Sequence, residues 1–207
     1  MEGKKRCVII CASPEFFFEG VHDTDYVIVC DGGYKYAKHC KIKVDLFIGD
    51  FDSYSGEVDE GIEVIQAPVA KDDTDALLAV KYAMKDGFKE FLLLGATGGR
   101  IDHQIANFNV AAFITNRGGH CEMIDNVNRF YSIKNEKITL KKRPGWSLSV
   151  FAHSEVCTGV TLKGVRYPLK DATITNDFPV GVSNEIVEEY AEVEVREGLM
   201  FVVESLV

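Results

Sequence analysis

The sequence predicts an α/β N-terminal domain with a mostly parallel sheet, followed by an all-β C-terminal sandwich. Up to about residue 120, segments with the pattern of buried strands alternate with segments of helical pattern. From about Ser132 onward no good helix pattern occurs, and short alternating segments are separated by turn residues. The first pattern is typical of a parallel sheet covered by helices, and the second of a small antiparallel sandwich or barrel.

Strands and helices alternate in the first domain. Strands are predicted at 6–11, 26–30, 46–48, 63–66, 91–94 and 121–124, and helices at 34–40, 74–86 and 102–115. The helix at 74–86 is the clearest, because its apolar residues fall mostly on one face and Gly87 suits its C-terminal end. That face consists of Leu77, Leu78, Val80, Ala83 and Met84.

The second domain is predicted from alternation over 146–153, 172–175, 186–196 and 199–204. Turn residues flank these segments at 144–145, 163–164, 179–181 and 197–198. The change of pattern places the boundary near 125–135, which gives domains of 1–130 and 131–207.

Composition excludes several classes of protein. Hydrophobic residues make up 46% and charged residues 27% of the 207 residues, the balance of an ordinary globular protein. The net charge of −9 argues against a nucleic-acid surface, which needs basic residues to meet phosphates. No apolar run approaches the roughly 20 residues that span a membrane.

The N-terminus and the cysteines favour a cytoplasmic protein. A short apolar stretch ends at Pro14 and Glu15, so we expect a first buried strand and no secretion signal. Six cysteines are scattered without a C-x-x-C pair, which predicts buried, reduced thiols.

Aspartate-rich loops follow the predicted strands. Ligands bind beyond the carboxyl ends of the strands in an open α/β sheet, so the loops at 31–33, 49–53 and 95–100 should meet at one edge. Asp50 and Asp52 point the same way if the backbone is extended, and Mg²⁺ takes one or two carboxylates with waters and phosphates. A turn with solvated aspartates is the other interpretation.

The segment 71–75 (KDDTD) lies at the start of the clearest helix, and it too has a structural and a metal-binding interpretation. Capping of the helix start explains Thr74, but four acidic or capping residues exceed what one helix end needs. On a helix Asp72 and Asp75 share a face, so Asp75 could reach a metal held by Asp50 and Asp52.

The loop at 95–103 (GATGGRIDH) is rich in glycine and opens a helix. Glycines let the backbone approach phosphates, and Arg100 can bind phosphate oxygens through two nitrogens. The loop is neither a P-loop nor a G-x-G-x-x-G motif. His103 is either a base or a structural histidine of the helix.

Taken together, these motifs resemble the thiamine pyrophosphokinase family. The matching segments are DGG at 31–33, IGDFDS at 48–53, KDDTD at 71–75, GATGGRIDHQIAN at 95–107, TLKGVRYPL at 161–169 and GVSNE at 181–185. The resemblance covers nearly the whole chain, with the motifs in the family's order.

The resemblance implies a Rossmann-like domain that binds ATP and Mg²⁺, and a sandwich that binds thiamine and forms a homodimer. The active site would lie between the first domain of one subunit and the sandwich of the other. Implied Mg²⁺ ligands are Asp50, Asp52 and Asp75. Implied nucleotide contacts are Asp31, Gly32, Gly33, Lys71, Thr97, Gly98, Gly99, Arg100, Asp102 and His103. Implied thiamine contacts are Tyr167, Ser183 and Asn184, with the Tyr167 ring stacked on the thiazolium.

The expected reaction is in-line attack of the thiamine hydroxyl on the β-phosphorus of ATP, with AMP as leaving group. Either Asp50 or Asp72 orients or deprotonates the hydroxyl, so the expected catalytic set is Asp50, Asp52, Asp72 and Asp75. Two other functions stay open at this point. DFDS also resembles the motif of aspartyl-phosphate phosphatases, with Asp50 as nucleophile, and a non-catalytic nucleotide-sensing module would bind MgATP without turnover. Without the resemblance, Tyr167 would be a strand aromatic before Pro168.

Overall fold

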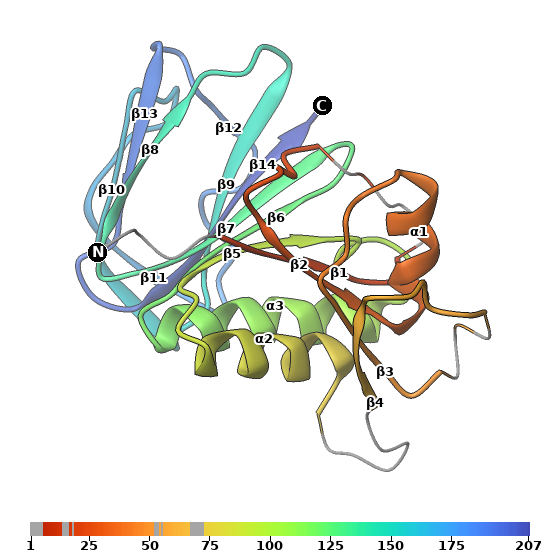
Figure 1. The fold of residues 1–207 in the computed structure, drawn as a ribbon. Coiled ribbons are helices and arrows are strands. Elements are labelled where there is room, and N and C mark those ends of the chain that lie inside the picture. Colours follow the sequence, from red (N-terminus) through yellow and green to blue (C-terminus); the bar gives the residue numbers. More distant parts are fainter. Residues whose placement is uncertain (1–5, 14–16, 18, 52–53, 55, 67–72) are drawn as a thin grey trace. The chain divides into compact units, whose positions relative to one another are not determined.

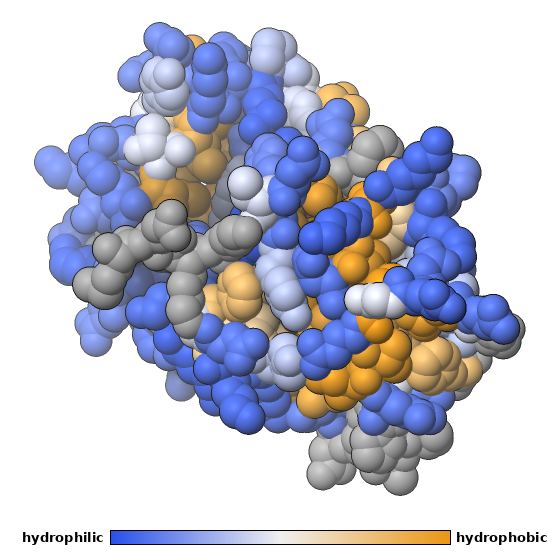
Figure 2. All heavy atoms as spheres, in the orientation of Figure 1, coloured by the Kyte–Doolittle hydropathy of each residue, from blue (hydrophilic) through white to orange (hydrophobic). Residues whose placement is uncertain are grey.

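The structure, a computed structural model, describes residues 6–13, 17, 19–51, 54, 56–66 and 73–207 (Figure 1). The chain divides into two compact units, residues 1–114 with 121–126 and residues 115–120 with 127–207. Hydrophilic residues cover most of the face seen in Figure 2, and hydrophobic ones gather over part of each unit. Within the part of the chain that the structure describes, no helix is long and apolar enough to cross a membrane.

The first unit is built on a row of neighbouring strands, most of them parallel. They are β1 (Cys7–Ile10), β2 (Tyr26–Cys30), β3 (Leu46–Gly49), β4 (Glu63–Gln66), β5 (Glu90–Leu94) and β6 (His120–Ile124), in the spatial order β6-β5-β1-β2-β3-β4. The pairings β1–β2, β2–β3, β3–β4 and β1–β5 are parallel. The order reverses between β1 and β5, and ligands of open α/β sheets bind beyond the carboxyl ends of strands at such a point.

Three helices accompany these strands in the described residues: α1 (Tyr34–His39), α2 (Asp75–Lys85) and α3 (Ile101–Asn116). The prediction of a helix over 74–86 is confirmed. Thr74 is its N-cap, and the Thr74 hydroxyl accepts a hydrogen bond from the Leu77 N–H at 3.2 Å. In α1, Tyr34 and Ala37 pack with Val8 and Ile10 of β1. Strand side chains alternate between faces, so α1 covers only this face of β1.

The second unit contains eight strands and no helix of its own beyond the end of α3. They are β7 (Asn128–Lys134), β8 (Lys137–Lys141), β9 (Trp146–Ala152), β10 (Val156–Lys163), β11 (Leu169–Thr175), β12 (Asn184–Glu185), β13 (Tyr190–Glu194) and β14 (Leu199–Leu206). Antiparallel pairing gives the orders β12-β9-β14-β7 and β11-β10-β13-β8. Both sets contribute to one core, with Val150, Val202 and Ile133 from the first and Val160 and Val193 from the second.

One predicted strand of this unit has the wrong bounds, and four strands were not predicted. The segment 186–196 is not continuous, because the N–H groups of Val187 and Glu188 bond to the Gly164 carbonyl and the strand begins only at Tyr190. The strands that were not predicted are β7, β8, β10 and β12. In β10 the alternation is broken at Gly159, where φ is 67° and the register with β11 shifts.

Candidate active site

A cavity of about 370 Å³ lies at the carboxyl ends of β1, β2 and β3 in the first unit. Its lining comes from residues that follow these strands and from the starts of α2 and α3, among them Asp31, Asp50, Asp75, Arg100 and His103. A second cavity of about 370 Å³ shares Ala12, Gly32, Arg100 and His103 with the first and extends to Gly95 and Gly98. The two cavities therefore adjoin each other beside the point where the strand order reverses.

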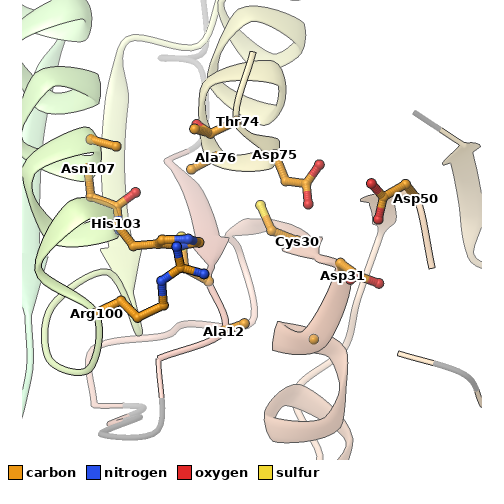
Figure 3. A pocket seen from close by; sticks show the side chains of 13 residues that line it. Ala12, Cys30, Asp31, Asp50, Thr74, Asp75, Ala76, Arg100, His103 and Asn107 are labelled. Carbon is orange, nitrogen blue, oxygen red and sulfur yellow. The ribbon is translucent and has the colours of Figure 1, made fainter. Parts of the chain in front are cut away.

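One side of the cavity is acidic. Figure 3 shows the carboxylates of Asp50 and Asp75 turned toward each other, with Asp31 close by. Asp31 is only 4% exposed and adopts a left-handed backbone with φ 36°. Asp75 is the first residue of α2, where a negative charge is favoured by the helix dipole.

The predicted metal ligands are only partly visible in the structure. Among the residues it describes, no group of three or more His, Cys, Asp or Glu side chains is arranged to hold a metal ion. Asp52, Asp72 and Lys71 lie outside the described residues. Asp50 and Asp75 are thus the two predicted ligands that the structure brings together.

The opposite side of the cavity is basic. Figure 3 shows Arg100 and His103 across the cavity from the three aspartates. Arg100 binds Asp102 through two nitrogens, with Nη2 to Oδ2 at 2.6 Å and Nε to Oδ1 at 3.1 Å. The Arg100 guanidinium holds the pKa of Asp102 below its ordinary value, and Asp102 raises the pKa of Arg100. Asp102 also accepts the His103 backbone N–H at 2.9 Å, so it braces the start of α3.

Two buried hydrogen bonds fix the glycine-rich loop. The Thr97 hydroxyl donates to Asp125 Oδ2 at 2.5 Å, and Asn107 Nδ2 donates to the Ala96 carbonyl at 2.7 Å. Thr97, a predicted nucleotide contact, is buried, and its hydroxyl serves the loop itself. Gly98 and Gly99 have φ of 80° and 68°, a conformation that favours glycine.

Sequence reasoning missed Asp125 and Asn107. Asp125 directly follows the strand β6, the same placement that drew attention to Asp31 and Asp50. The position of Asp125 directly after a strand could therefore have identified it from the sequence.

Glycines of the first two loops are required by close packing. A Cβ on Gly33 would lie 2.4 Å from the Ile10 carbonyl oxygen, and a Cβ on Gly49 would lie 2.7 Å from the Asp31 Cβ. Both Gly32 and Gly33 are buried, and of the two only Gly32 belongs to the lining of the cavity. Gly33 thus allows the turn at Asp31–Gly33 to pack directly against the backbone of β1.

The predicted thiamine contacts lie together in the second unit. Asn184 is buried, and its side chain binds the backbone of Tyr167: Oδ1 accepts the Tyr167 N–H at 3.0 Å, and Nδ2 donates to the Tyr167 carbonyl at 2.8 Å. The Tyr167 side chain is left outside, with the residue 67% exposed. Ser183 has φ 57°, and its N–H donates to Ser149 Oγ at 3.0 Å. Asn184 therefore positions Tyr167 by holding its backbone.

Known proteins resemble both parts of the chain. The family model for the thiamin pyrophosphokinase catalytic domain matches residues 19–122, and the model for the thiamin pyrophosphokinase vitamin B1 binding domain matches residues 135–200. A thiamine pyrophosphokinase of Bacillus subtilis (strain 168) is 28% identical over 172 residues, which is 79% of each chain.

Solved structures agree over nearly the full length. The crystal structure of thiamine pyrophosphokinase from Bacillus subtilis has a TM-score of 0.88 at 23% identity, covering 98% of this chain and 99% of that one. A thiamin pyrophosphokinase family protein from Enterococcus faecalis has a TM-score of 0.81 at 26% identity, with the same coverage. Because the two family models together match most of its length, the chain belongs to the thiamin pyrophosphokinase family, diphosphotransferases whose substrates are thiamine and ATP.

Proposed function

We propose that the cavity of the first unit is where the diphosphate of ATP passes to the thiamine hydroxyl, leaving thiamine diphosphate and AMP. The observation that carries this proposal is the division of the cavity into an acidic side and a basic side at the reversal of strand order. That strand order supports describing the first unit as Rossmann-like. In the second unit, the two antiparallel sets of strands share one core, which supports describing that unit as a β-sandwich.

The acidic side fits Mg²⁺. Carboxylate oxygens are the hard donors that this ion prefers, and it takes only one or two of them beside waters and phosphates. Asp50 and Asp75, which line the cavity, would supply these donors. Asp52, outside the described residues, would be a further ligand. Held there, Mg²⁺ would supply positive charge that neutralises the phosphates.

The protein's own residues bind the phosphates and position the hydroxyl. Arg100 offers a fork of N–H donors to phosphate oxygens, held in place by Asp102. The Gly98 and Gly99 backbone permits close approach of the phosphate chain, and Lys71 adds a positive charge. Asp50 or Asp72 orients the thiamine hydroxyl and accepts its proton, so the oxygen attacks in line with the departing AMP.

The second unit supplies the thiamine subsite. The exposed Tyr167 ring suits stacking with the cationic thiazolium, Asn184 fixes the Tyr167 backbone, and Ser183 stands beside Asn184. We propose a cytoplasmic homodimer in which this subsite completes the catalytic cavity of the partner subunit.

Family membership favours this function over the two alternatives that the sequence left open. An aspartyl-phosphate enzyme would use Asp50 as a nucleophile, but those enzymes usually carry the motif on the first strand. Here Asp50 follows β3, after β1 and β2. A nucleotide-sensing module would have no need of a thiamine-binding domain, which the second family match describes.

The experiment compares Asp75→Asn with Asp73→Asn, two residues apart at the start of α2. Asp75 lines the cavity, whereas Asp73 pairs with Lys81 at 2.6 Å. Each change removes one charge near the start of α2, and Asp73→Asn also weakens the pair with Lys81, so the Tm of both variants is measured beside kcat. We expect Asp75→Asn to lower kcat by about 100-fold or more and Asp73→Asn to retain it. Equal kcat values in the two variants would contradict the placement of the site.

A further inference from the structure

Two cysteines stand side by side in the lining of the cavity. The parallel register of β1 and β2 pairs Ile10 with Val29, so Cys11 and Cys30 follow as opposite neighbours at the carboxyl ends of these strands. Both line the cavity, although they are only 6% and 5% exposed. Figure 3 shows the Cys30 side chain within the lining, between Asp75 and His103.

The environment keeps the Cys30 thiol protonated. A side-chain hydrogen bond with Cys11, burial and the Asp75 carboxylate all raise the pKa of Cys30 well above its ordinary value. Reagents that must capture a single thiolate therefore react slowly with Cys30. A reagent that binds both sulfurs gains from their proximity, because the second bond forms within one complex.

The surroundings also restrict what the pair can hold. Structural zinc sites need four ligands, but the described residues offer no group of three His, Cys, Asp or Glu side chains suited to a metal. Cys7 and Cys121 are buried in the same unit and do not line this cavity. The site thus suits a thiophilic centre that needs two sulfurs and no further protein ligand.

We propose that Cys11 and Cys30 form a dithiol site for monosubstituted trivalent arsenicals, and that its occupation excludes the nucleotide. With phenylarsine oxide, two As–S bonds form and the As=O bond breaks. The two thiol protons leave with the oxygen as water, and no atom changes oxidation state. Binding itself depends only on the two thiols, whereas exclusion of ATP rests on the function proposed above.

Mass spectrometry of the intact protein after phenylarsine oxide tests the site. We expect one phenylarsenic adduct per chain, removed by 2,3-dimercaptopropanol, and much slower labelling of Cys30 by iodoacetamide, read from the Cys30 peptide. The adduct should be lost in Cys11→Ala and in Cys30→Ala, with Cys30→Ser as a second variant if Cys30→Ala does not fold. It should persist in Cys121→Ala, which removes a buried thiol of the same unit.

The outcomes separate the two parts of the proposal. No adduct on the wild-type chain, or an adduct unchanged in the Cys11 and Cys30 variants, would overturn the dithiol site. Slower adduct formation at saturating MgATP would support exclusion of the nucleotide. If the adduct depends on both cysteines but forms equally fast with MgATP, the dithiol site stands and the proposed place of the nucleotide is contradicted.

Discussion

Replacing Thr97 by Val should loosen the glycine-rich loop. Valine keeps the shape of the side chain but removes the hydroxyl that donates to Asp125 at 2.5 Å. A buried hydrogen bond to a charged group contributes about 1.5–3 kcal/mol. In a chain of this size 1 kcal/mol shifts Tm by roughly 2–4 °C, so Tm should fall by about 3–12 °C. The KM for ATP should rise as the backbone of Gly98 loses its fixed position.

Thermal unfolding followed by circular dichroism, with a double-mutant cycle, isolates this contact. Thr97→Val, Asp125→Asn and the double variant should show a coupling energy of about 1 kcal/mol or more. Thr97→Ser retains the hydroxyl and should recover much of the ATP affinity. The reasoning is refuted if Thr97→Val unfolds like the wild type, or if the two single effects simply add.

Three further predictions concern other parts of the chain. Gly33→Ala places a Cβ 2.4 Å from the Ile10 carbonyl oxygen and should destabilise the protein by about 1–3 kcal/mol, measured as a lowered Tm; an unchanged Tm would mean that the turn shifts freely. Asn184→Ala removes the bonds to the Tyr167 backbone and should raise the KM for thiamine while the KM for ATP stays constant; parallel changes in both constants would contradict a positioning role. Burial lowers the pKa of His153 below its ordinary 6.5, so the unfolded chain takes up a proton first as pH falls. The free energy of unfolding should therefore decrease as pH drops through about 6.5. His153→Gln should lessen this fall between pH 7.5 and 5.5, and an identical pH dependence would exclude His153 as its source.

Local patterns accounted for most elements of the first unit. The helix α2 was predictable because Thr74 caps it and Gly87 ends it with φ 83°. The strands β2 and β4 begin and end as predicted. The second unit was harder, because the local pattern there did not mark where its strands begin and end. Alternation continued across the turn before β13, and Gly159 interrupted it within β10.

For the candidate site, topology was predictable and side-chain partners were not. Parallel strands end at one edge, which explains why Asp31 and Asp50 line the same cavity. The bond from Thr97 to Asp125 joins residues 28 apart, and that from Asn184 to Tyr167 joins residues 17 apart. Such pairs depend on tertiary packing, so no local pattern identifies them. In both bonds, a residue that was predicted to contact a ligand instead holds part of the protein's own backbone in place.

The most direct test of the central claim is a product assay with purified protein, thiamine, ATP and Mg²⁺, read by phosphorus NMR. Thiamine diphosphate and AMP should appear in equal amounts, and both should depend on Asp75. ADP with thiamine monophosphate would mean attack at the γ-phosphorus and a different seating of ATP in the cavity. Absence of any thiamine-dependent product would contradict the account as a whole.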